Sequence, residues 1–161
     1  MAKNIPLSTI GVRVSYAVET SSGTRPTTAY TIIKGLYSTP DFNVAPSTAD
    51  VTSFDNVEYT SKIALLKEMP DTIEFGARFG QEFANGWKAL VTAYETANTA
   101  GKEVWFCIDI PDYDESIYFT GRPIKLGLPA LEANSGIDTA VYVAPTGEPQ
   151  YATDPTYATE A

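Results

Sequence analysis

The chain has 161 residues, 43% hydrophobic and 19% charged, which fits one globular domain spanning 1–161. Its net charge of −9 argues against a sequence-specific DNA- or RNA-binding protein, because such proteins neutralise phosphates with basic side chains. The absence of histidine excludes Ser-His-Asp and Cys-His catalysis, and a single cysteine, Cys107, excludes an internal disulfide. No apolar run is long enough for a secretory signal or a membrane span, so we expect no membrane partner.

The first half of the chain alternates between strand patterns and polar connections. Alternation over residues 10–18, with Val14, Tyr16 and Val18 on one face, predicts a half-buried strand. The segments that follow are an exposed Ser/Thr-rich loop at 19–29, a strand at 30–36, a long loop at 38–56, a strand or short helix at 57–66, and a strand at 72–79 with Glu74 facing outward.

The periodicity changes from two to about 3.6 residues after this strand. Apolar side chains then recur on one face of a helix predicted over 81–98, which we expect to end at Gly101; they are Phe83, Trp87, Leu90, Val91 and Tyr94. Strands are predicted at 103–110, with both faces covered, and at 117–126 and 137–143. Residues 1–9 are expected to form an N-terminal arm and residues 145–161 a mobile tail.

This order of elements predicts an α+β, mainly β chain. We expect an antiparallel β-sandwich or barrel with one flanking helix.

Candidate chemistry is sparse. The cluster Asp109, Asp112, Asp114 and Glu115 has oxygens for a cation but lacks an EF-hand pattern, so a solvated turn is the alternative. Paired carboxylates for glycoside hydrolysis stay open as well, because spacing in sequence does not give distance in space. Cys107 lies in an apolar strand and is expected to be structural. We therefore expect no catalytic residue, no metal and no cofactor.

The order of the segments resembles the tail tube protein, or major tail protein, of bacteriophages with long non-contractile tails. The resemblance covers roughly residues 5–144 and is carried by GLYSTPDFNVAPSTADVTSFDNVEYTSKIALLKEMPDTIEFGARF and by the helix that follows. Within it, residues 50–55 (DVTSFD) resemble the D-V-T-x-[LF]-D passage of that family. The secreted tube protein of type VI systems has a related fold.

The resemblance implies a structural virion protein that forms hexameric rings, which stack into a tube for passage of duplex DNA. It implies assembly in the host cytoplasm, with tape-measure, tail-tip and tail-terminator proteins as further partners. The loop at 38–56 would then contact the adjacent ring through Asp41, Phe42, Asn43, Asp50, Phe54 and Asp55. Strand alternation points to Glu58 and Glu74 as acidic residues facing the lumen.

Two alternatives remain open at this stage. One is the secreted-type tube of a contractile or type VI-like system. The other is a non-catalytic β-sandwich binding module for sugar or protein, for which ten tyrosines and two tryptophans would be suitable.

Overall fold

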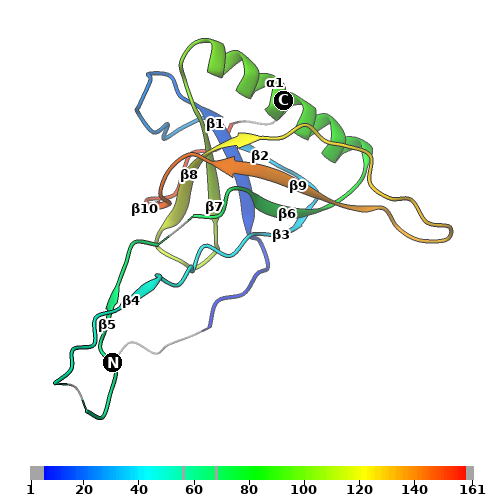
Figure 1. Cartoon of the computed structure of the whole chain (residues 1–161). Coiled ribbons are helices and arrows are strands. Elements are labelled where there is room, and N and C mark those ends of the chain that lie inside the picture. The colour runs from blue at the N-terminus through cyan, green and yellow to red at the C-terminus, as the bar shows by residue number, and fades with distance from the viewer. Residues whose placement is uncertain (1–5, 56, 68, 159–161) are drawn as a thin grey trace.

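The computed structural model describes residues 6–55, 57–67 and 69–158, which form ten strands and one helix (Figure 1). The elements are β1 Arg13–Val18, β2 Thr31–Ile32, β3 Leu36–Ser38, β4 Thr48–Asp50, β5 Lys62–Ala64, β6 Ile73–Arg78, α1 Gln81–Thr99, β7 Val104–Asp109, β8 Ser116–Pro123, β9 Asp138–Pro145 and β10 Gln150–Ala152. This composition confirms the expected α+β, mainly β class. Residues 1–5 of the expected N-terminal arm and residues 159–161 of the expected C-terminal tail lie outside the described residues.

The main sheet contains eight antiparallel strands. Seven follow the order β2-β1-β7-β8-β9-β6-β3, and β10 pairs with the first half of β8. The other two strands, β4 and β5, pair only with each other. The eight strands curl into one half-barrel rather than forming two facing sheets (Figure 1).

The curl is imposed by a very short connection between the two ends of the sheet. The first and last strands in the order, β2 and β3, are separated in sequence only by residues 33–35. Six strand spacings in a flat sheet would separate them by about 29 Å, whereas the chain from Ile32 to Leu36 spans at most about 14 Å. Ile33 donates a hydrogen bond to Val14 of β1, and Gly35 accepts one from Arg78 of β6, both at 2.8 Å.

The strand expected at 30–36 is therefore two short strands at opposite ends of the sheet. The chain leaves one for the other at Gly35, which has a φ of +93° and where an added Cβ would lie 3.1 Å from the Cβ of Phe83. Glycine adopts this left-handed conformation without the steric penalty of other residues. The apolar run thus marked buried residues correctly but concealed the break between the strands.

Helix α1 packs against one face of the sheet, here called the inner face. Phe83, Trp87, Leu90 and Val91 are buried there, as predicted, and Tyr94 is half-buried. The helix ends as expected: the N–H of Gly101 bonds the carbonyl of Asn98, and that of Lys102 bonds the carbonyl of Ala97. This pair of bonds is a Schellman motif, which satisfies carbonyls that a helix end leaves free.

The opposite, outer face is covered over β1, β7 and β8 by the C-terminal segment. β10 pairs with Ser116–Tyr118 of β8, and Tyr157 forms a bridge with Tyr30. Together they enclose a second small core of Ala17, Tyr30, Trp105, Cys107 and Tyr118. All six residues of β7 are buried, which confirms that both of its faces are covered.

The sequence of the C-terminal segment predicts mobility, but the described residues 145–158 have defined partners. Asp154 accepts a hydrogen bond from Ser116 at 2.6 Å, and Tyr157 donates one to Asp109 at 3.0 Å. The segment lacks periodicity because its only strand has three residues, so isolated bonds and ring contacts hold the remainder. Such contacts depend on residues far away in the chain and leave no local pattern.

A buried carboxylate fixes the loop that follows β1. Glu19 is 3% exposed, although the sequence predicts an exposed loop there. It accepts hydrogen bonds from the backbone of Gly23 and Glu103 and from the indole of Trp105, at 3.0, 3.2 and 2.9 Å. Burial acts to raise the pKa of Glu19, but these bonds and the charge of Lys102 outweigh burial and lower it.

Replacing Trp87 by alanine tests the packing of α1. The side chain is 1% exposed, and its indole donates a 2.9 Å hydrogen bond to the carbonyl of Ile124. Trp87→Ala should lower the free energy of unfolding by about 3–5 kcal/mol in urea denaturation. The exposed neighbour Lys88 is the control, since Lys88→Ala should change it by less than about 0.5 kcal/mol. Equal effects of the two variants would contradict this packing.

Replacing Glu19 by glutamine tests the buried carboxylate through its pH dependence. Because the pKa of Glu19 is lower in the folded state, its charge stabilises the fold above the unfolded pKa, and this stability is lost as pH falls through the folded pKa. Glu19→Gln should therefore cost about 1–3 kcal/mol at neutral pH and much less in acid, in urea titrations across pH. Glu132→Gln, at an exposed site, is the control, and a pH-independent cost for Glu19→Gln would contradict the role of the charge.

Candidate assembly interface

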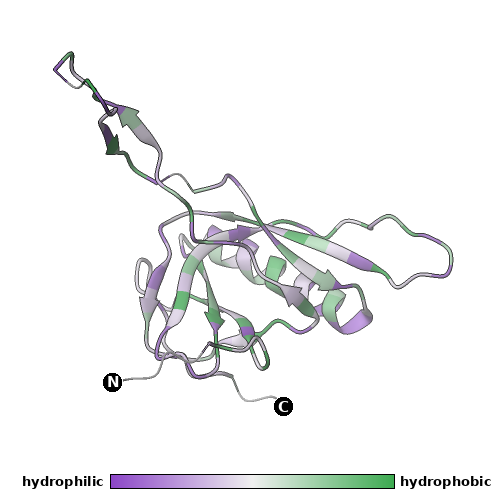
Figure 2. Cartoon of the chain, turned by 90° about the horizontal axis from the view of Figure 1, so that it is seen from below, coloured by the Kyte–Doolittle hydropathy of each residue, from purple (hydrophilic) through white to green (hydrophobic). Residues whose placement is uncertain are grey.

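A long hairpin, here called the arm (residues 39–72), projects away from the sheet and the helix (Figure 2). It contains β4 and β5, which pair from Thr48 opposite Ala64 to Asp50 opposite Lys62. Backbone bonds extend this ladder, since Leu65 donates to Ser47 at 2.7 Å and Val51 donates to Ser61 at 2.9 Å. The arm therefore has a defined direction and includes both the predicted loop at 38–56 and the ambiguous segment at 57–66.

Side-chain hydrogen bonds fix both ends of the β4 side of the arm. Asp41 accepts a bond from the N–H of Asn43 at 2.7 Å, and Asp50 accepts one from the N–H of Thr52 at 2.8 Å. The Thr52 hydroxyl also donates a hydrogen bond to Asp50. The hydroxyl bond is the larger cause, and the backbone bond the smaller, of a lowered pKa of the Asp50 carboxyl. Asp41, Asn43 and Asp50 thus shape the arm.

Phe42 anchors the arm in the protein. Its ring lies 5.1 Å from the ring of Phe119, and the half-buried side chain packs against the inner core. The sequence groups Phe42 with Phe54 as loop aromatics, but the structure separates them. Phe54 and Asp55 lie at the far end of the arm, where the side chain of Phe54 is fully exposed.

The arm exposes an unusual number of large apolar side chains. We call four of them, near its far end, the tip cluster: Val51, Phe54, Val57 and Tyr59. Ile63, Leu65 and Leu66 are also exposed, closer to the sheet. Large apolar side chains that gather on one exposed segment are characteristic of an interaction site. Of these seven residues, only Phe54 is among the contact residues expected from the sequence. The others are marked in the sequence only by their apolar character within an otherwise polar connection.

A groove of about 1060 Å³ runs between the base of the arm and the end of the sheet. We call it the root groove; its apolar lining includes Phe42, Val44, Met69, Ile110, Ile117 and Tyr151. Tyr151, on β10, is 58% exposed. The groove combines segments that are distant in sequence, so no local pattern indicates it.

The two residues predicted to face a lumen lie on different parts of the molecule. Glu58 is exposed on the arm, between β4 and β5, and Glu74 is exposed on the outer face of β6. Around Glu74 the outer face is free of the C-terminal segment. It carries the ion pair between Arg78 and Asp138, at 2.6 Å, and the ring of Tyr37, 4.3 Å below the Arg78 guanidinium.

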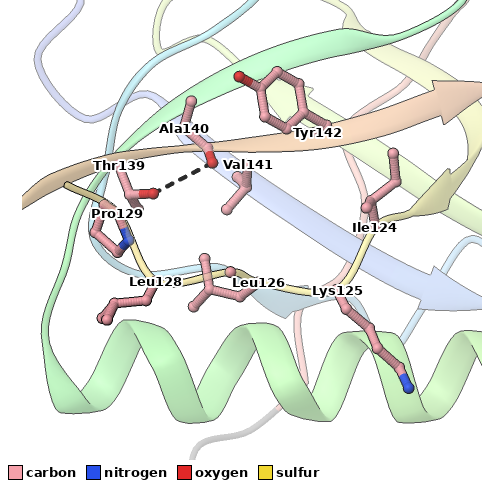
Figure 3. Close-up of a pocket in the computed structure, with 10 residues that line it drawn as sticks. Ile124, Lys125, Leu126, Leu128, Pro129, Thr139, Ala140, Val141 and Tyr142 are labelled. Atoms are coloured by element: carbon pink, nitrogen blue, oxygen red, sulfur yellow. Dashed lines mark hydrogen bonds between the residues drawn. The ribbon is translucent and has the colours of Figure 1, made fainter.

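A smaller pocket of about 300 Å³ lies between residues 124–129 and β9 (Figure 3). Polar and apolar atoms contribute about equally to its walls, and Leu126, Val141 and Tyr142 are among the lining residues. Lys125 extends away from the pocket toward α1, where its ammonium lies 3.7 Å from Glu95. Lys125, the charged residue of the lining, is thus paired with Glu95 and not directed into the pocket.

The four acidic residues that the sequence places at 109–115 do not point toward a common site. Asp109 is buried and accepts a 2.7 Å hydrogen bond from Arg13, whereas Asp112, Asp114 and Glu115 are exposed in the turn before β8. Within the described ranges, no three His, Cys, Asp or Glu side chains are placed to share a metal ion. Burial raises the pKa of Cys107 to about 11, which keeps its thiol protonated at neutral pH.

No protein-family model and no curated protein sequence matches the chain. In the part of the chain that the structure describes, no helix is both long and apolar enough to cross a bilayer. What the protein does must therefore be inferred from its own surfaces, of which the arm and the root groove are the most distinctive.

Two phenylalanine variants test the division of the arm into an anchor and a free end. Phe42→Ala should lower the free energy of unfolding by about 2 kcal/mol, because a half-buried ring in contact with Phe119 is lost. Phe54→Ala should change it by less than about 0.5 kcal/mol, because the ring contacts nothing that folding buries. Urea denaturation of both variants measures the difference, and comparable losses would contradict the assignment.

Proposed function

We propose that the chain is the subunit of a self-assembling tube, of the kind formed by the tail tube proteins that its sequence resembles. Hexameric rings would close around a channel and stack through the arm, and the channel would carry duplex DNA during infection. The observation that carries the proposal is the arm itself. It holds seven exposed large apolar side chains on a hairpin that points away from its own core.

The arm has the properties of an assembly element. The β4–β5 ladder and the Phe42 anchor hold the arm in one direction, so the arm loses little further conformational freedom when it binds a partner. The side chains of the tip cluster are exposed in the single subunit, and burying them against another copy would remove that apolar surface from water. Asp41, Asn43 and Asp50 would act by shaping the arm, and Phe54 and Asp55 by lying at the contact.

The outer face of β6, β9 and β3 is the surface best suited to line a channel. The inner face is filled by α1, and the C-terminal segment covers the outer face over β1, β7 and β8. On the open part, Glu74 and Asp138 are offset by Arg78 and Arg122, and one of these pairs is bonded. A surface with balanced, paired charges would not retain the phosphates of a passing duplex as a basic surface would.

Electron microscopy of the concentrated protein tests the function. The wild-type chain should form rings or tubes. A variant with residues 48–64 replaced by a short glycine linker should remain folded and monomeric, because the retained Ser47 and Leu65 are bonded neighbours that the linker can join. A wild-type chain that stays monomeric at every concentration would contradict the tube, and sugar-dependent binding by that monomer would favour a binding module instead.

A further inference from the structure

The arm has an apolar far end that contacts nothing, and the base of the same arm borders an apolar groove. We infer that the tip cluster of one copy docks in the root groove of a second copy. The inference rests on the proposed tube function and adds to it the partner of the tip and the surface that receives it.

The two surfaces match in chemistry. The tip presents Phe54, Val57 and Tyr59, which are 105%, 89% and 82% exposed. The groove presents mainly aliphatic, aromatic and proline side chains, together with the charged residues Asp41, Lys67 and Glu148. Its volume of about 1060 Å³ exceeds that of several apolar side chains. Aromatic side chains that enter apolar pockets supply much of the binding energy of protein interfaces.

A tip cannot reach the groove of its own copy. Between Ser47 and Phe54 the arm extends by seven residues, which in an extended strand is about 23 Å. The arm leads away from the sheet, while the groove lies at its base (Figures 1 and 2). The cross-strand bonds of β4 and β5 oppose a fold-back, so a tip that enters a root groove enters the groove of another copy.

A contact between two different surfaces of identical chains is directional. When each copy gives its tip to one neighbour and receives the tip of another, a free tip and a free groove remain, and the contact can repeat from copy to copy. This is the geometry that stacking requires, and it differs from a symmetric contact between two arms.

The contact is small, and its size sets the conditions for observing it. Two aromatic side chains bury about 300–500 Å², whereas stable interfaces bury about 1,200–2,000 Å² in total. One docked tip would therefore hold two subunits only weakly. Chemical cross-linking captures such a contact without requiring a stable complex.

The test uses two variants, each with one added cysteine, that differ in tag length and are mixed at high concentration with a short bifunctional maleimide. Val57→Cys labels the tip and Glu148→Cys labels the rim of the root groove, and both sites are exposed. The buried Cys107 stays unreactive, since burial raises its pKa to about 11. Leu128→Cys, 77% exposed on the loop between β8 and β9, replaces Glu148→Cys in the control mixture.

The mixed tip–groove product should exceed the tip–Leu128→Cys product at least about tenfold, because docking raises the local thiol concentration. Adding Phe54→Asp to the tip variant should reduce the yield to that of the control. Equal yields in the two mixtures, a yield unchanged by Phe54→Asp, or a dominant tip–tip product from Val57→Cys alone would each overturn the inference.

Microscopy of the wild-type chain separates this inference from the proposed function. Tubes that form without a tip–groove product would retain the function and overturn the docking site. A tip–groove product from a chain that never forms tubes would retain the docking site and overturn the tube.

Discussion

Three residues that join the two ends of the main sheet determine the shape of the protein. Ile33 is bonded to β1 and Gly35 to β6, so the first and last strands of the sheet are held within the reach of one short connection. The sheet must curl to satisfy it, and curling gives the sheet two unequal faces. α1 fills the inner face, while the C-terminal segment covers only part of the outer face, which leaves β6, β9 and β3 open to solvent.

The sequence predicted the elements whose signals are local. The helix periodicity located α1 and its end at Gly101, and the alternation at 72–79 located β6 with Glu74 outward. It did not predict the burial of Glu19 or the pairing of β10, because both depend on residues far away in the chain. Glu19 accepts a hydrogen bond from the indole of Trp105, and β10 pairs with β8. The break at Gly35 was hidden because apolar residues continue on both sides of it.

The arm shows the same limit within the candidate site. The residues expected in a stacking loop fall into two groups: Asp41, Phe42, Asn43 and Asp50 shape and anchor the arm, and Phe54 and Asp55 lie at its far end. Val57, Tyr59 and Leu66 were not expected there, because residues 57–66 gave an ambiguous pattern and were separated from the loop. The root groove was beyond prediction, since its walls come from four distant segments.

In the proposed tube, the size of the arm contact and the number of copies would act together. A contact made by a few side chains leaves an isolated subunit free of its neighbours, which prevents polymerisation while the chain is dilute. A ring offers several such contacts to the next ring at once, and each contact that forms raises the effective concentration of the others. The anchor at Phe42 matters for the same reason, because arms held in one direction can engage simultaneously, whereas freely moving arms would lose that advantage. A rigid arm with a weakly binding end would thus allow separate subunits at low concentration and cooperative assembly of the proposed tube.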